Sequence, residues 1–166
     1  MKLFKVATLL TLLSTQCYAG VEDGMYNPPT VTEIKTQHVD SLSCLAMNLY
    51  FEARSESDIS LITITAVVFN RVDDVRFPDT ICEVVYSDRA FSWLNGDVSL
   101  EVKNIEQYKR VYKIAEHAIM NRQFIQEMSE GVDHYHEKSI KPYWSKSKKV
   151  TFKSRVDNHL FYSSKW

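Results

Sequence analysis

The chain has 166 residues, of which 45% are hydrophobic and 12% aromatic, and its formal net charge is −1. This length suits one domain, and the composition is sufficient to bury a core. A near-neutral charge does not indicate a nucleic-acid-binding protein, because that class depends on a basic surface.

Residues 1–19 are typical of a secretory signal peptide. Lys2 and Lys5 precede an apolar run that ends at Leu13, and Ala19 lies at the expected cleavage site. The run is too short to cross a membrane, so we expect an exported chain, in the periplasm or cell wall, with no stable membrane anchor. A retained anchor is the alternative. Removing the signal leaves a net charge of −3, which predicts no long-range attraction to an anionic wall.

Residues 20–39 contain the pair Pro28-Pro29 and show no hydrophobic periodicity. We expect a flexible linker there, followed by a single domain over residues 40–166.

The first predicted helix covers residues 42–53, with Ser41 as its N-cap. Glu52 lies in the last turn, beside the apolar stripe. At that position the helix dipole opposes a negative charge, and apolar neighbours remove water from the carboxylate. A carboxyl that keeps its proton can act as a general acid. An ordinary ion pair of Glu52 with Arg54 or Arg71 fits the same pattern.

Residues 58–73 allow two interpretations. Their β-branched side chains favour a strand, whereas their length and 3.6-residue period favour a buried helix with Asp58 as N-cap. We expect the helix. Its predicted common face consists of Ile59, Ile62, Ala66, Phe69 and Val72.

The rest of the chain predicts two more helices and a small β element. A short helix is expected over Asp79–Tyr86 and a long one over residues 100–121, with Ile105 in its inner stripe. Residues 134–136 and 158–162 have the pattern of short strands, and Lys146–Arg155 that of a basic loop. The predicted fold class is α+β, mostly helical.

Six motifs occur in order along the chain: YFEAR at 50–54, AVVFNR at 66–71, RFPDTIC at 76–82, FSW at 91–93, HYH at 134–136 and NHLFY at 158–162. Together they resemble the SleB/CwlJ-type cell wall hydrolases, which are spore-cortex-lytic enzymes and their bacterial and phage relatives. The resemblance implies a lysozyme-like fold for the hydrolase domain, a catalytic glutamate at Glu52, and peptidoglycan glycan strands as the partner. The resemblance also allows a phage origin, in which case the protein would be an endolysin.

Glycosidic cleavage by hydrolysis uses a second carboxylate. Glu56 matches the family at its offset from Glu52, although Ser55 and Ser57 stand where the family usually has Gly and Pro. Glu56 could instead cap a helix or bind Arg71. The other candidates are Asp58, Asp88 and Asp97.

A mechanism with one carboxylate is also available, and the resemblance implies it for part of the family. Glu52 would donate its proton and then take one from the C6 hydroxyl of the same sugar, giving a 1,6-anhydro product. We therefore expect a lytic transglycosylase, with muramidase-type hydrolysis as the alternative. We expect no cofactor, and a monomer.

Substrate contacts should be aromatic and hydrogen-bonding, because sugar rings stack on aromatic faces and their hydroxyls need partners. Packing is the alternative role for each candidate, above all for Phe91. The candidates on the family's motifs are Glu56, Phe91, Ser92, Trp93, Tyr135, His136, Asn158 and His159.

Two other functions fit parts of the sequence. His134, His136 and His159 could hold a metal in a peptidoglycan amidase with Glu52 as base, although no HExxH motif is present. A non-catalytic peptidoglycan-binding module would need no desolvated glutamate.

After signal removal two cysteines remain, Cys44 and Cys82. In an oxidising compartment such a pair predicts a disulfide, with two buried thiols as the alternative.

Overall fold

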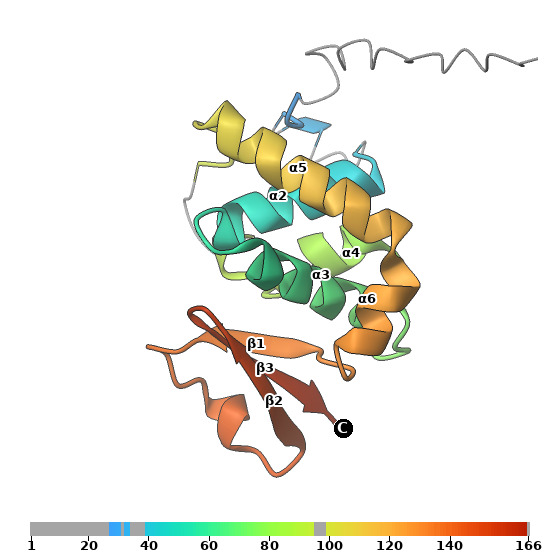
Figure 1. The fold of residues 1–166 in the computed structure, drawn as a ribbon, viewed down its shortest axis with the longest axis vertical. Coiled ribbons are helices and arrows are strands. Elements are labelled where there is room, and N and C mark those ends of the chain that lie inside the picture. Colours follow the sequence, from blue (N-terminus) through green and yellow to red (C-terminus); the bar gives the residue numbers. More distant parts are fainter. Residues whose placement is uncertain (1–26, 31, 34–38, 95–98, 166) are drawn as a thin grey trace, which may run out of the picture.

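The computed structural model describes residues 27–30, 32–33, 39–94 and 99–165. A group of packed helices lies above a small sheet (Figure 1). The predicted signal peptide, most of the predicted linker and Asp97 lie outside the described residues. The helices are α2 (Ser41–Ala53), α3 (Asp58–Val72), α4 (Ile81–Tyr86), α5 (Ile105–Met120) and α6 (Arg122–Met128), and the strands are β1 (His134–Glu137), β2 (Val150–Val156) and β3 (His159–Ser164).

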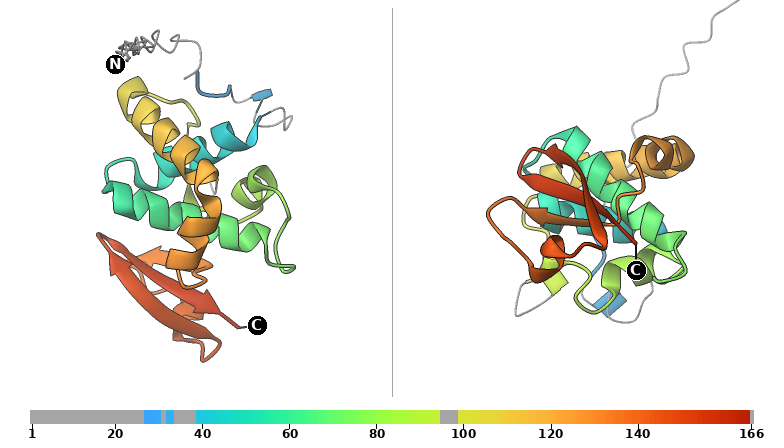
Figure 2. Two further views of the ribbon diagram at one scale, coloured as in Figure 1. Left: turned by 45° about the vertical axis from the view of Figure 1, so that its right-hand side comes forward. Right: turned by 90° about the horizontal axis from the view of Figure 1, so that it is seen from below.

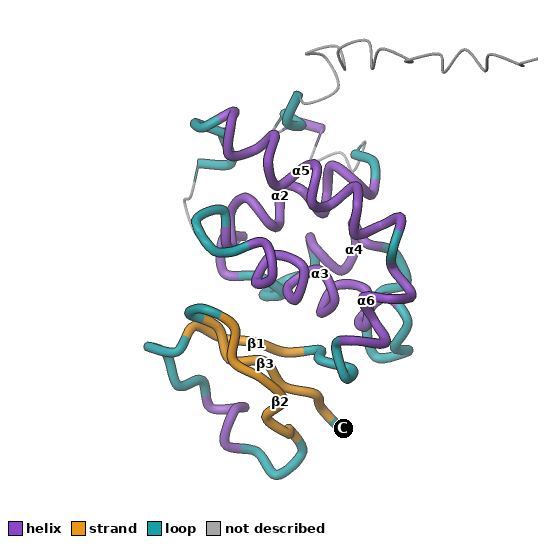
Figure 3. The backbone as a smooth tube through the Cα atoms, viewed as in Figure 1, coloured by secondary structure: helices purple, strands orange, loops and turns teal. Residues whose placement is uncertain are grey.

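The mostly helical α+β class, with a small C-terminal β element, is confirmed (Figure 3). None of the helices in the described part of the chain is long and apolar enough to cross a membrane.

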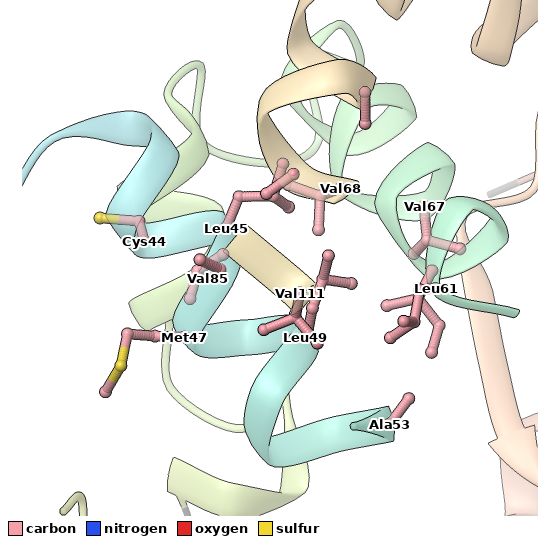
Figure 4. Packing of buried hydrophobic residues seen from close by; sticks show 14 of the residues in the cluster. Cys44, Leu45, Met47, Leu49, Ala53, Leu61, Val67, Val68, Val85 and Val111 are labelled. Carbon is pink, nitrogen blue, oxygen red and sulfur yellow. The ribbon is translucent and has the colours of Figure 1, made fainter. Parts of the chain in front are cut away.

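Helix α2 is the centre of the core. It packs against α3, α4 and α5, and nine of its thirteen residues are buried. Its N-cap is Asp40 rather than the predicted Ser41, because a carboxylate oxygen of Asp40 accepts the backbone N–H of Ser43 at 2.9 Å. Figure 4 shows Leu45 and Leu49 of α2 within this core, together with Val85 of α4 and Val111 of α5.

The segment after α2 is a helix, as predicted, although its β-branched residues favour a strand locally. Its N-cap is Ser57, one residue before the predicted Asp58. The predicted inner face was partly wrong, since Ile59 and Ile62 are 67% and 39% exposed. The buried side chains of α3 include Leu61, Ile64, Val67, Val68 and Phe69.

Two predicted helix starts were wrong, and one strand and one helix were not predicted. Helix α4 begins at Ile81, where the Thr80 side chain caps it, instead of at Asp79. Helix α5 begins at Ile105, which is 42% exposed and so lies outside the inner stripe. The predicted basic loop contains β2, whose side chains are mostly exposed or half-buried, and α6 was not predicted.

The strands form an antiparallel sheet in the order β1-β3-β2. It lies across one side of the helical group (Figure 2) and contacts α3. Because neighbouring strand residues point to opposite faces, Tyr135 of β1 shares a face with its partner Phe161 of β3. These two rings face the helices, where Tyr135 packs near Phe91. His136 and Tyr162 lie on the outer face, under Trp144.

Candidate active site

Glu52 lies in the last turn of α2, where the helical group meets the sheet. Its Oε2 accepts a hydrogen bond from the Tyr135 hydroxyl at 2.8 Å. Its Oε1 accepts from the backbone N–H of Ser92 at 3.1 Å and from the Ser92 hydroxyl at 3.2 Å. The half-buried carboxylate is therefore held by two distant segments, rather than by the predicted ion pair with Arg54 or Arg71.

The Tyr135 hydroxyl is fixed by aromatic packing around its ring. Phe161 lies 5.5 Å from the ring centroid and His159 lies 5.3 Å from it, edge-on. Burial raises the pKa of Tyr135 well above its usual value, and the charge and hydrogen bond of Glu52 raise it further. Tyr135 thus keeps its proton and remains available as a hydrogen-bond donor to the glutamate.

Arg71, near the end of α3, places a positive charge behind this pair. Its side chain is only 8% exposed, its Nε donates to the backbone oxygen of Asp133 at 2.8 Å, and its guanidinium lies 5.3 Å from the rings of both Phe77 and Phe91. Burial lowers the pKa of Arg71, while the nearby groups of Tyr135, Asp133 and Glu52 oppose that change. Arginine remains charged after such a shift, so Arg71 balances part of the charge of Glu52.

These groups line a cavity of about 350 Å³ between the helices and the sheet. Glu56 lies in its wall, with Oε1 accepting from the Asn158 amide at 2.9 Å. Glu137, at the end of β1, is a further carboxylate of the cavity. The complete lining is Glu52, Glu56, Arg71, Ala90, Phe91, Ser92, Tyr135, His136, Glu137, Ile140, Asn158 and His159.

Most of the predicted substrate contacts meet at this cavity, but Trp93 does not. The Trp93 ring is 5% exposed, stacks on Phe51 at 4.9 Å and donates its indole N–H to the Asn48 side chain at 3.0 Å. We therefore leave Trp93 out of the proposed substrate contacts and assign it to packing beneath α2. Phe91 touches the cavity but is only 3% exposed.

Two other candidate carboxylates lie elsewhere, and Asp97 lies outside the described residues. Asp58 pairs with Arg110, and Asp88 lines a neighbouring cavity instead. Glu137 and Arg71 were not predicted as site residues. The alternation of side chains between the two faces of β1 could have predicted Glu137 as a site residue, because Glu137 shares a strand face with Tyr135.

The three histidines of the metal hypothesis do not converge. His134 hydrogen-bonds Asp133 at 2.9 Å on the outer face of the sheet. His136 hydrogen-bonds the Tyr162 hydroxyl at 3.1 Å on that face, although it also borders the site cavity. His159 faces the helices, near the Ser60 hydroxyl at 3.5 Å. Within the described ranges, no group of three His, Cys, Asp or Glu side chains is placed to hold a metal ion.

A larger hollow lies elsewhere. It has a volume of about 900 Å³ and lies beside α4, with Val39, Phe77 and Tyr86 in its wall. We place the site at the smaller cavity because Glu52, Glu56 and Arg71 meet there, and converging charged groups are typical of catalytic sites.

A glutamate bound by two hydroxyls in a polar cavity is suited to acid–base chemistry. The chain belongs to the cell wall hydrolase family, whose sequence profile, described as Cell Wall Hydrolase, matches residues 55–162. The family resemblance of the motifs is thereby confirmed. Glu52 lies just before the matched range, so its role is supported by the YFEAR motif and by the geometry of the site.

A spore cortex-lytic enzyme of Oceanobacillus iheyensis is 31% identical over 74 residues, which are 44% of this chain and 27% of that protein. The match thus spans about a quarter of that relative's length. No solved structure matches the chain. Family membership therefore gives the class of the protein, a cell wall hydrolase.

Proposed function

We propose that this chain is a lytic transglycosylase that cleaves peptidoglycan glycan strands between N-acetylmuramic acid and N-acetylglucosamine. The observation that carries the proposal is the position of Glu52, at the wall of a polar cavity, with both carboxylate oxygens held. A glycan strand needs such a groove, because its sugars bind through hydroxyl and amide groups.

In the first step protonated Glu52 donates its proton to the glycosidic oxygen, and the bond from that oxygen to C1 of the muramic residue breaks. The C6 hydroxyl of the same residue then attacks C1, and its proton passes to Glu52. The products are a free hydroxyl on the leaving sugar and a 1,6-anhydro ring. Glu52 regains its proton, and no water is consumed.

The partners of Glu52 suit both of its protonation states. The hydroxyls of Tyr135 and Ser92 donate to the ionised carboxylate. Each can turn to accept a hydrogen bond from the O–H of the acid form, because a hydroxyl is both donor and acceptor. The positive charge of Arg71 stabilises the carboxylate between the two proton transfers.

Muramidase-type hydrolysis is the second candidate, because Glu56 and Glu137 share the cavity with Glu52. Either could serve as the nucleophile or as the base for water. The side-chain amide of Asn158 donates a hydrogen bond to one carboxylate oxygen of Glu56, and the Glu137 side chain is exposed at the edge of the cavity. These positions favour substrate contact for Glu56 and Glu137, so we retain transglycosylation as the proposal.

The products distinguish the two reactions. We expect digested sacculi to yield 1,6-anhydromuropeptides, lighter by one water than the corresponding reducing-end species. Mass spectrometry of the released muropeptides measures this difference directly. Finding only reducing-end muramic acid would make the enzyme a muramidase.

Glu56→Gln and Glu137→Gln test the second carboxylate. If Glu52 acts alone, each variant should keep activity within about tenfold of the wild type, since only binding contacts change. Each should also give the same anhydro products. A loss as large as that of a general acid, in either variant, would identify the missing carboxylate of a hydrolase.

Tyr135→Phe should lower the rate of sacculus digestion about ten- to a hundredfold, because a hydrogen bond to a charged group contributes about 1.5–3 kcal/mol. The matched control is Tyr86→Phe in α4. It removes a hydroxyl of a residue that lines a different hollow, away from the Glu52 cavity. The control should change the rate less than about twofold. Equal losses in the two variants would show that loss of the bond to Glu52 is not responsible.

A further inference from the structure

The charge of this chain is divided unequally along its length. Residues 40–133 contain sixteen acidic and nine basic side chains, a balance of −7. Residues 134–166 contain eight basic and two acidic side chains, a balance of +6. The expectation that a net negative chain gains no attraction from an anionic wall therefore does not hold for the sheet end of the molecule.

Part of this positive charge lies beside the candidate active site. The segment 138–144, which we call the basic rim, runs from the end of β1 into the following 3-10 helix (Tyr143–Lys146). Ile140 lines the site cavity, and Trp144 lines a neighbouring cavity of about 440 Å³. Both cavities have Arg71, Ala90 and Tyr135 in their walls. The basic rim thus borders two hollows that share part of their walls.

The basic rim is anchored at both ends, yet its side chains are exposed. The backbone N–H of Lys138 donates to the Asn158 oxygen at 2.7 Å, and the Trp144 ring packs 5.1 Å from His134. Between these anchors Lys138 and Lys141 are exposed, and Tyr143 is 94% exposed. Two cations and an aromatic ring therefore point into solvent at the edge of the site.

We infer that the basic rim binds the peptide stems of peptidoglycan through their carboxylates, while the glycan strand occupies the cavity. This inference depends on the proposed function. The sugars of the strand are uncharged, and its anionic groups are the carboxylates of stems attached to muramic residues. A cut beside a muramic residue brings its stem to the edge of the cleft. Mobile lysines suit a flexible carboxylate, and the Tyr143 ring offers a surface to the peptide.

The test uses Lys138→Glu/Lys141→Glu and two substrates: intact sacculi, and sacculi whose stem carboxylates and amines have been made neutral by amidation and acetylation. We expect the variant to digest intact sacculi about three- to tenfold more slowly than the wild type, because two exposed attractions become repulsions. On the neutralised sacculi both proteins should act equally. Raising the salt concentration should reduce the difference on sacculi, since exposed charges are screened.

The matched control is Lys103→Glu/Lys113→Glu, which makes the same change in net charge at exposed lysines near and within α5. Its activity on both substrates should equal that of the wild type, and melting temperatures should show that all variants are folded. Equal losses on intact and neutralised sacculi, or no loss on either, would overturn the inference. A loss that disappears once wall phosphate polymers are removed would assign the lysines to phosphate and overturn it too. Wild-type protein that cleaves neither substrate would refute the proposed function instead.

Discussion

Glu52→Gln is expected to leave the fold intact and to lower the cleavage rate by a factor on the order of 10²–10⁴, the typical loss on removing a general acid. The amide keeps the shape of the side chain, and its oxygen can still accept the Ser92 backbone N–H. The amide cannot donate a proton to the glycosidic oxygen at a useful rate. Dye release from labelled sacculi measures the loss.

The reference for this result is Glu56→Gln, which makes the same chemical change within the same cavity. A matching melting temperature for the two variants would exclude unfolding as the cause of lost activity. A folded Glu52→Gln variant that keeps more than about a tenth of the wild-type rate would contradict the assignment of Glu52.

Hydrophobic periodicity predicted the long helices because their buried faces repeat along a single segment. The stripe of α5 from Tyr108 to Ala118 is buried as expected. Periodicity could not select among alternative faces of α3, because its apolar residues are not confined to one side of the helix. Ile59 and Ile62 have the right residue type but lie on the side that other helices leave uncovered.

The strand β2 was missed because its sequence, VTFKSRV, gives little hydrophobic signal. Its neighbour in the sheet is β3, and many of its side chains reach solvent. An edge strand of this kind is stabilised mainly by backbone hydrogen bonds and cross-strand contacts, which are set by the partner strand. Its charged residues were therefore interpreted as a loop.

The motifs predicted Glu52, Ser92 and Tyr135 as site residues, but they did not predict the hydrogen bonds that join them. Tyr135 is 83 positions from Glu52 in sequence, and their hydrogen bond depends on docking of the sheet against the helices. The buried position of Trp93 depends in the same way on tertiary packing, since it lies beside Ser92 in sequence but points into the core.

Removing the Cys44–Cys82 disulfide should lower the stability of the protein by a large amount and leave its chemistry unchanged. The structure joins the start of α2 to α4 through this bond, across a separation of 38 residues. Constraint of the unfolded chain over such a loop contributes up to about 4 kcal/mol. For a domain of this size, a loss of that order lowers the melting temperature by on the order of 10 °C. The Cys44→Ser/Cys82→Ser variant should show this shift in thermal unfolding followed by circular dichroism.

Activity should respond differently from stability in this variant. Cys44 lies two turns before Glu52 in α2, about 12 Å along the helix axis, so the bond does not touch the cavity. The folded variant should therefore digest sacculi at nearly the wild-type rate well below its melting temperature. Reducing agent should lower the melting temperature of the wild type and leave that of the variant unchanged. Two reactive thiols per chain, in denatured and unreduced exported protein, would show that the cysteines are free, and the stability argument would then fail.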